Sequence, residues 1–281
     1  MTLKPYHQGQ LDYFCAIYAL INALRLTHGI RLAQGRGILN GTLREISSHA
    51  LLWRSLLQNR TDSHWLMDYL LGNFCREGSL ALRVARLPSS PPFSRQLKEV
   101  AGFTGQAASV HLRRGLEACA ACFDDEQFIN WLGLRTPEPV ALAALGEADL
   151  RRTKGEFECA ASLRSGETTP AKWSIDELRA VLRRWLPVEG VFKPLSGETA
   201  QKRSLLLRFH RFLPFERLPL VSHWSTARSI SLDTLRLYDC TADKQAIHSL
   251  QLRRCALCPE ELNKKRLIGL EIESMYFIEK V

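Results

Sequence analysis

The alternation of apolar and polar positions divides the chain into a helical first part and a strand-rich last part. Between residues 14 and 26, apolar side chains recur at steps of three and four, which predicts a buried helix. From Ser204 onward, short segments rich in Leu, Ile, Val, Phe and Tyr are separated by Pro, Ser, Asp and Thr, as in antiparallel strands. This order predicts an α+β fold rather than alternating βαβ units.

Further elements are predicted between these two parts. The glycine-rich residues 29–41 predict a loop, and Thr42 with Glu45 three positions later predicts a capping box that opens the next helix. The pattern then predicts a helix that opens at residue 62 or 63, a short strand at 80–87 and a helix at 174–186. Ser174 and Glu177 form the capping box of the last of these helices.

Length and hydropathy indicate one large domain. The 281 residues, of which 46% are hydrophobic, suffice for a packed core, and we expect a single domain over 1–281 with a helical and loop insertion at about 80–200. No run of 18 apolar residues occurs, and the first residues lack the basic and then apolar pattern of a signal peptide. We therefore expect a cytoplasmic protein without a membrane span, or one delivered to a target cell without a cleaved signal.

The chain carries a formal net charge of +9, which is spread over both halves rather than gathered in a tail. Such a charge favours solubility and attracts acidic partners. The sequence contains no recognition helix, aromatic RNA-binding signature or long basic run, so nucleic acid is not the partner that it favours.

Eight cysteines in a chain without a secretion signal do not indicate a disulfide framework. Two pairs, Cys119 with Cys122 and Cys255 with Cys258, have the Cys-x-x-Cys spacing that could supply four thiolates to a structural zinc. The first pair lies in a helical pattern, whereas zinc knuckles usually come from turns. We therefore expect neither a metal nor another cofactor.

Cys15 stands where a polar lead-in changes into the first apolar helix. Unpaired backbone N–H groups and the helix dipole favour an anion there, so a thiol at this position has a lowered pKa and is a better nucleophile. Gln8 and Gln10 lie just upstream, and each could donate a side-chain N–H to a developing oxyanion. A cysteine at the start of a core helix is usually a packing residue. A catalytic role for Cys15 therefore depends on whether a suitable partner lies further along the chain.

His223 and Asp239 are the best downstream partners. His223 lies in one predicted strand, and Asp239 lies near the end of the next strand, beyond a turn. A hairpin could bring both side chains to one face of the sheet, where the carboxylate would fix the tautomer of the imidazole and favour its charged form. If the helix of Cys15 packs across this sheet, the three residues supply a nucleophile, a base and an orienting group. His210 and His248 are alternative bases without so well placed a carboxylate.

Three segments together resemble the papain-like cysteine peptidases, and most closely the bacterial branch that contains the double-glycine leader peptidases. They are QGQLDYFCAIYALINAL, SHWSTARSIS and LRLYDC. The resemblance implies an α+β fold in which a nucleophile at a helix N-terminus packs on an antiparallel sheet. By the same resemblance Cys15 is the nucleophile, His223 the general base and acid, and Asp239 the orienter. Gln8 or Gln10 completes the oxyanion hole with the backbone N–H of Cys15.

The resemblance covers about the first 26 residues and residues 218–242, and two features depart from it. The family's glutamine precedes the cysteine by a spacing that lies between those of Gln8 and Gln10. The bacterial branch commonly has glycine after the nucleophile, where this chain has Ala16. The first leaves the choice between the two glutamines nearly even, with Gln8 slightly favoured, and the second removes no catalytic group.

These observations lead us to expect a cysteine hydrolase that cleaves a peptide, an isopeptide or a side-chain amide bond in a protein or peptide substrate. Deamidation and deconjugation of a small modifier use the same groups. Two other classes stay open. One is an inactive papain-like scaffold that binds a protein through the 80–200 region, and the other is a zinc-containing nucleic-acid-binding protein.

Overall fold

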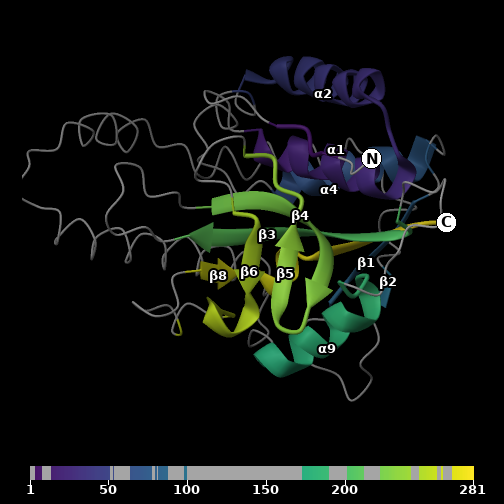
Figure 1. The fold of residues 1–281 in the computed structure, drawn as a ribbon. Helices are drawn as coiled ribbons and strands as arrows, with labels where there is room; N and C mark the ends of the chain where they lie inside the picture. The colour runs from purple at the N-terminus through teal and green to yellow at the C-terminus, as the bar shows by residue number, and fades with distance from the viewer. Residues whose placement is uncertain are drawn as a thin grey trace, which may run out of the picture.

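The computed structural model has the expected α+β composition (Figure 1). It describes residues 4–7, 14–50, 53, 64–77, 80, 82–87, 98–99, 173–189, 201–211, 222–241, 247–257, 261 and 268–281. The helices are α1 (Cys15–His28), α2 (Leu32–Ser47), α4 (His64–Glu77) and α9 (Ile175–Trp185). The strands are β1 (Leu82–Arg86), β2 (Lys98–Glu99), β3 (Arg203–Arg211), β4 (Ser222–Ser231), β5 (Thr234–Leu237), β6 (Ser249–Gln251), β7 (Cys255–Ala256), β8 (Ile268–Leu270) and β9 (Tyr276–Lys280).

One sheet joins these strands in the order β2-β1-β9-β3-β4-β5-β6, with antiparallel neighbours throughout this path. Strand β8 also pairs with β3, antiparallel, and with β7, parallel. Most of the sheet therefore comes from the part of the chain after Ser204, as the apolar pattern predicts. The first third of the chain contributes β1, which lies against β9 at the end of the chain.

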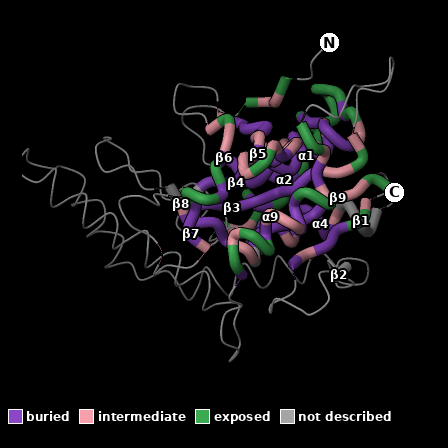
Figure 2. The backbone as a smooth tube through the Cα atoms, turned by 60° about the horizontal axis from the view of Figure 1, so that its bottom comes forward, coloured by how far each residue is buried: buried purple, intermediate pink, exposed green. Residues whose placement is uncertain are grey.

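The helices cover both faces of the sheet. Helices α1, α2 and α4 lie on one side and α9 on the other (Figure 1). Alternate residues of β3 divide between two apolar clusters, because successive side chains of a strand point to opposite faces. Leu206 joins the cluster of Leu20 from α1, whereas Leu205 and Leu207 join that of Leu182 from α9. Figure 2 shows α1, β3 and β4 largely buried between the outer elements.

Helix α1 is buried almost all round, as its apolar spacing predicts. Ile17, Leu20, Ile21 and Leu24 are at most 2% exposed. The helix contacts β3 and β4 on the sheet and α2 and α4 on its other side, which explains why few polar residues interrupt it. It ends at Gly29, whose φ of 66° is the left-handed conformation that glycine adopts without strain.

The loop predicted over residues 29–41 is wrong, because α2 begins at Leu32 and continues through three glycines. Gly35 explains the difference. It is buried against α1, and a Cβ atom there would lie 3.1 Å from the Cγ2 atom of Ile21. Glycine costs helix propensity, but here it allows two helices to approach closely, and the tertiary contact outweighs the local preference.

The two predicted capping boxes have opposite outcomes. Thr42 lies in the interior of α2, so the box predicted there is wrong, and the carboxylate of Glu45 instead accepts a hydrogen bond from the hydroxyl of Tyr69 on α4. The box at the start of α9 is confirmed. The Ser174 hydroxyl accepts from the Glu177 backbone N–H at 3.2 Å, and the Glu177 carboxylate accepts from the Ser174 N–H at 2.9 Å.

The insertion predicted at about 80–200 lies mostly outside the described residues, but the helix predicted at 174–186 is confirmed as α9. Both ends of the region nevertheless belong to the main core. Strand β1 pairs with β9, and α9 packs its apolar side into the cluster on the far face of the sheet.

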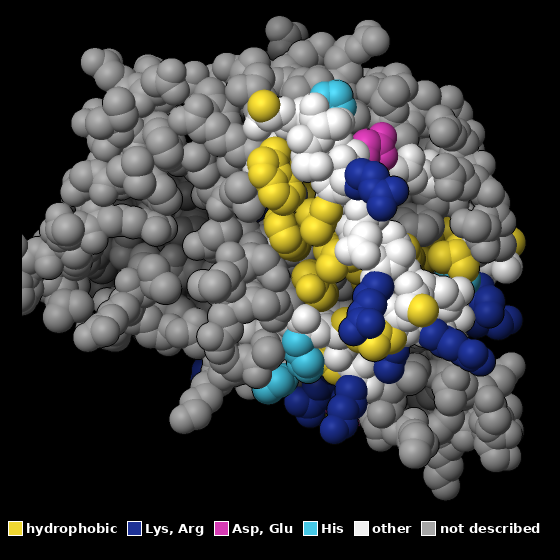
Figure 3. Space-filling model, turned by 90° about the horizontal axis from the view of Figure 1, so that it is seen from above, with side chains coloured by type: hydrophobic (Ala, Val, Ile, Leu, Met, Phe, Trp, Pro, Cys, Tyr) yellow, Lys and Arg dark blue, Asp and Glu magenta, His cyan; other side chains and the backbone are white. Residues whose placement is uncertain are grey.

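Most of the described charged residues on the side of the molecule that carries α2 are basic. Arg31, Arg36 and Arg44 are exposed at or along this helix, and Lys and Arg side chains predominate over acidic ones in the view of this side (Figure 3). Part of the positive charge of the sequence therefore lies on the surface above α1, where it attracts acidic groups at long range. Within the described part of the chain, no helix combines the length and the apolar character needed to cross a bilayer.

Candidate active site

Cys15 is the first residue of α1, and Phe14 is its N-cap. The sulfur therefore lies among the unpaired backbone N–H groups at the positive end of the helix. The ring of His223 and the backbone of Trp224 lie close enough to the sulfur to lower the pKa of its thiol. The structure thus brings together the two residues that the sequence placed in separate elements at opposite ends of the chain.

A buried hydrogen bond sets the position of α1 along β4. The Thr226 hydroxyl donates to the carbonyl oxygen of Ala19 at 2.6 Å. Ala19 lies one turn after Cys15, and Thr226 lies three residues after His223. The contact therefore fixes the helix against the strand close to the two groups that meet.

A β-bulge places Asp239 on the same face as His223. In the hairpin of β4 and β5 the register shifts between Ala227 and Ser229, so that Arg228 is an extra residue on β4. If Arg228 were instead paired regularly, the pairing seen nearer the turn would continue and Asp239 would face Thr226, whose side chain points to the opposite face. With the bulge, the Tyr238 N–H donates to the Thr226 carbonyl at 2.7 Å, and Asp239 lies beside Ser225 and His223.

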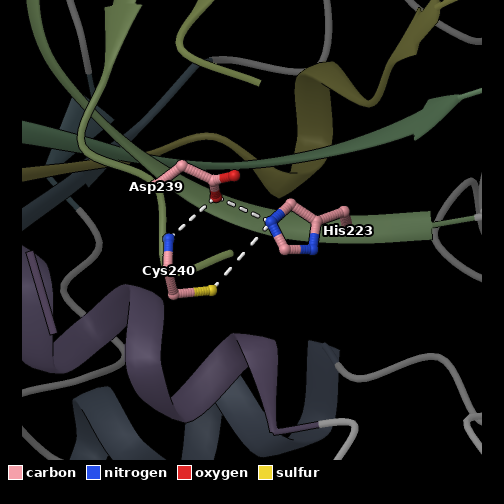
Figure 4. A group of neighbouring side chains, drawn as sticks. All are labelled: His223, Asp239 and Cys240. Atoms are coloured by element: carbon pink, nitrogen blue, oxygen red, sulfur yellow. Dashed lines mark hydrogen bonds and ion pairs between the residues drawn. The ribbon is translucent and has the colours of Figure 1, made fainter. Parts of the chain in front are cut away.

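Asp239 is buried and held by several donors (Figure 4). Its Oδ1 atom lies 2.7 Å from the Nε2 atom of His223. The same oxygen accepts from the Ser225 hydroxyl at 2.8 Å and from the Cys240 backbone N–H at 3.0 Å. These contacts fix the carboxylate, and through it the orientation of the ring.

The ring of His223 is fixed on its other sides as well. Phe209 on β3 meets it edge-on, with ring centroids 5.5 Å apart and planes at 68°. Because Nε2 is taken by Asp239, we infer that Nδ1 is the nitrogen that contacts the Cys15 thiol. Neutral His223 with its proton on Nε2 then presents an unprotonated Nδ1 to the sulfur.

The electrostatics of the group favour a thiolate and an imidazolium. Burial raises the pKa of Cys15, but the hydrogen bond and charge of His223 outweigh burial and leave this pKa below its ordinary value. Burial lowers the pKa of His223, but hydrogen bonds with Asp239 and Cys15 raise it well above its ordinary value. Burial raises the pKa of Asp239, but His223 brings it below its ordinary value. All three shifts favour the charged forms.

A buried ion pair lies next to this group. Arg208 faces Trp224 in the pairing of β3 with β4, and its Nη1 atom lies 3.5 Å from the Oε1 atom of Glu271. Both side chains are less than a tenth exposed. The positive charge of Arg208 also contributes to the lowered pKa of Cys15, after the larger effects of burial, His223 and Trp224.

Gln8 and Gln10, the two predicted oxyanion donors, lie outside the described residues. The segment just before them is anchored to α1. The side chain of Asn22 pairs with both backbone groups of Tyr6, accepting from its N–H at 2.8 Å and donating to its carbonyl at 3.0 Å. These bonds satisfy the buried Asn22 side chain and fix the chain two residues before Gln8.

His7, His28 and His248 are not part of the group. His7 and His248 are exposed, and His28 forms its hydrogen bond with the neighbouring Thr27 at 2.7 Å. His210 lies in β3 opposite Ser222, and its side chain is outside the described residues. Of the cysteines considered for zinc, Cys119, Cys122 and Cys258 lie outside the described residues. Cys255 is buried in β7, with its thiol 3.4 Å from the Gln251 carbonyl oxygen.

No family model matches the chain, and no significant match is found among curated proteins or solved structures. The site therefore has to be interpreted from its own geometry.

Three residues of the site escaped the analysis of the sequence. Ser225 lies two positions after His223, so the two-residue repeat of a strand could have placed it on the same face. Cys240 follows Asp239 directly, and its Sγ atom lies 4.0 Å from His223 Nε2. No local pattern marks Thr226, whose role arises from the packing of α1 on β4.

The arrangement can perform nucleophilic chemistry. It combines a buried thiol at a helix N-terminus, an imidazole in contact with it, and a carboxylate on the opposite ring nitrogen. These are the components of a Cys-His-Asp triad, in which the imidazole carries a proton between the thiol and a leaving group.

Proposed function

We propose that this protein is a cysteine-dependent hydrolase with a papain-like architecture. Cys15 is the nucleophile, His223 the general base and acid, and Asp239 the residue that orients and charges the imidazole. The substrate is a protein or peptide, and the bond cleaved is a peptide, an isopeptide or a side-chain amide. The support for this function is the contact between the thiol of Cys15 and a ring whose Nε2 atom lies 2.7 Å from a buried carboxylate oxygen.

The assembly of this group from distant segments is unusual for packing residues. A buried cysteine is commonly inert, and a buried histidine is commonly satisfied by one partner. Here the cysteine begins a helix, the histidine has a partner on each side, and a bulge turns the carboxylate towards it. Perturbed pKa values of opposite direction in two touching groups are a feature of catalytic sites.

In the first step the Cys15 thiolate attacks the carbonyl carbon of the substrate, and the electron pair of the C=O bond moves to the oxygen. His223 then gives its Nδ1 proton to the leaving amine as the C–N bond breaks. A thioester results. Water attacks the thioester while His223 accepts its proton, and the acid product leaves with the thiolate restored.

The oxyanion needs donors in the vicinity of the nucleophile. The backbone N–H of Cys15 is unpaired within α1 because it lies in the first turn. We propose that Gln8 or Gln10 supplies the second donor, as the resemblance to the papain-like peptidases implies. The anchoring of Tyr6 by Asn22 brings the chain back over α1 just before these residues.

A peptide bearing a thiol-reactive electrophile tests the nucleophile. We expect one adduct, mapped by peptide mass spectrometry to Cys15, that is lost in Cys15→Ala and slowed in His223→Ala. Cys255→Ala is a matched control, because Cys255 is also buried but lies in the other apolar cluster. Labelling that persists in Cys15→Ala contradicts the proposal. A folded protein whose Cys15 resists labelling indicates the inactive binding scaffold instead.

The bond cleaved is found by separating the products. Fluorescent peptide libraries, isopeptide-linked conjugates and glutamine-containing proteins report peptidase, deconjugating and deamidating activity, the last through released ammonia. Each activity should be lost in Cys15→Ala and kept in Cys255→Ala.

A further inference from the structure

One cluster of side chains in the described part of the chain could hold a metal ion, and it consists of His223, Asp239 and Cys240 (Figure 4). The Nε2 atom of His223, a carboxylate oxygen of Asp239 and the Sγ atom of Cys240 all lie within 4.8 Å of one another. All three residues are buried. Nitrogen, oxygen and sulfur donors in this combination suit zinc and similar borderline-soft divalent cations.

The second oxygen of Asp239 points to a missing ligand. Oδ1 accepts from His223, Ser225 and the Cys240 N–H. The Thr241 hydroxyl is near enough to help lower the pKa of the carboxyl, but Oδ2 is buried and has no donor in hydrogen-bond geometry within the part of the chain that the structure describes. A buried carboxylate oxygen without a partner is costly. A cation bound at Oδ2 would remove this cost and leave the hydrogen bonds from Ser225 and Cys240 to Oδ1 in place.

The separation of the nitrogen and sulfur ligands is close to that in a tetrahedral zinc site. Zinc bonds of about 2.0–2.3 Å place a nitrogen and a sulfur ligand about 3.6 Å apart. The Sγ atom of Cys240 lies 4.0 Å from His223 Nε2, so these two atoms need to approach each other only slightly. Asp239 Oδ1 lies 2.7 Å from Nε2, and this hydrogen bond is lost when the ion replaces the Nε2 proton and Oδ2 becomes the ligand. Asp239 and Cys240 follow the end of β5, where the chain is no longer bound into a regular ladder.

We propose that zinc, or a divalent cation of like chemistry, binds His223 Nε2, Asp239 Oδ2 and Cys240 Sγ and thereby switches the site off. The inhibitory part rests on the proposed function, whereas the binding part does not. The ion replaces the Nε2 proton of His223 and the thiol proton of Cys240, and both protons go to solvent. Asp239 and the Cys240 thiolate match its two charges, so the imidazole is left neutral.

A neutral, metal-bound imidazole can neither stabilise the Cys15 thiolate nor protonate the leaving amine efficiently. The thiolate loses the positive charge beside it, and the Nδ1 proton is a much weaker acid for the leaving amine than that of an imidazolium. The ion therefore acts from the side of the ring opposite to Cys15. This distinguishes it from a cation bridging Cys15 and His223, and from a structural zinc held by Cys255.

The full-length protein tests the site by competition for zinc with a chromogenic chelator. We expect Cys240→Ser to weaken zinc binding at least about tenfold, because loss of even an outer-shell partner costs about 10–100-fold in metal affinity. Cys255→Ser and Cys15→Ala should bind as tightly as the unaltered protein. Cobalt in place of zinc should give a thiolate-to-metal absorption band that is missing in Cys240→Ser.

Three outcomes would overturn the proposed site. Zinc binding lost in Cys255→Ser assigns the ion to the Cys-x-x-Cys pairs, and zinc binding lost in Cys15→Ala places it between Cys15 and His223. Equal affinity of Cys240→Ser and the unaltered protein excludes Cys240 as a ligand. If Cys240→Ser does not fold, as judged by circular dichroism, His223→Gln provides the same comparison.

Labelling of Cys15 separates this inference from the proposed function. Zinc should slow alkylation of Cys15 in the unaltered protein and in Cys255→Ser, but not at the same concentration in Cys240→Ser. If Cys15 is not labelled even in the absence of metal, the proposed hydrolase is contradicted. The zinc titration then still shows whether the ion binds at this site. Normal labelling that zinc does not alter contradicts inhibition by the ion and leaves the hydrolase intact.

Discussion

Ser225 and Asp239 lie side by side across the β4–β5 hairpin, and the serine hydroxyl donates to the aspartate at 2.8 Å. They meet because Arg228 is an extra residue on β4, which shifts the pairing by one position. A one-residue shift in a strand exchanges the two faces of the sheet. The bulge therefore decides whether the carboxylate faces His223 or the opposite side.

Deletion of Arg228 should remove the bulge and leave Asp239 beside His223. Ser229 then follows Ala227 directly, so the pairs Ser229–Arg236 and Ala227–Leu237 belong to one regular register and Asp239 still faces Ser225. We therefore expect the deletion variant, like Arg228→Ala, to label Cys15 at nearly the original rate. A fall of about tenfold in its labelling at neutral pH, with its fold intact by circular dichroism, would show that the bulge does more than absorb the extra residue.

Asp239→Asn should shift the reactivity of Cys15 to higher pH. The carboxylate raises the pKa of His223, and the imidazolium in turn lowers the pKa of Cys15. Loss of the carboxylate charge therefore lowers the pKa of His223 and raises the pKa of Cys15. A rise of one unit in the thiol pKa reduces the thiolate about tenfold at a pH below it.

The measurement for this variant is the rate of iodoacetamide alkylation as a function of pH. Asp233→Asn is the control, since Asp233 lies in the turn away from the site. An alkylation profile that is unchanged in Asp239→Asn contradicts electrostatic coupling through His223.

Thr226→Val should loosen the contact of α1 with β4. The substitution keeps the shape of the side chain and removes the buried hydrogen bond to Ala19, for an expected loss of about 1 kcal/mol in the free energy of unfolding. Because this bond positions the helix near Cys15, alkylation of Cys15 should slow as well. Thr226→Ser keeps the hydroxyl and should restore alkylation more fully than stability, since it also removes a buried methyl group. Denaturant unfolding and alkylation rates give the two values.

Asn22→Leu should release the segment that contains Tyr6. The two backbone groups of Tyr6 lose their partners, at an expected cost of about 1–3 kcal/mol in the free energy of unfolding. We expect faster proteolysis near the N-terminus and a larger loss of substrate turnover than of Cys15 alkylation. Asn40→Ala, on the exposed side of α2, is the control and should change neither. Unaltered stability in Asn22→Leu would argue against an anchoring role.

The oxyanion donor can be assigned by comparing Gln8→Ala with Gln10→Ala. Removal of an oxyanion donor lowers turnover by about 10²–10³-fold, whereas alkylation by iodoacetamide forms no oxyanion and should change little. One of the two variants should show this divergence. If neither does, the second donor is not a glutamine of this segment.

Local signals in the sequence predicted much of the framework. The apolar spacing of α1, the capping box of α9 and the short apolar segments of the sheet all depend on neighbouring residues, and each is found in the structure. The same reasoning failed at α2, because the value of Gly35 lies in a contact with Ile21 on another helix. It also failed at Thr42, where a good capping sequence lies inside a longer helix.

The sequence by itself determined which residues could form the site and in which elements they lie: Cys15 at the start of a helix, His223 in a strand and Asp239 after the next one. Only the tertiary structure decided that they meet. The regular hairpin pairing seen near the turn would have put Asp239 on the wrong face, and the bulge at Arg228 reverses this. Register and helix position depend on contacts between remote segments, such as Thr226 with Ala19, and no local preference encodes them.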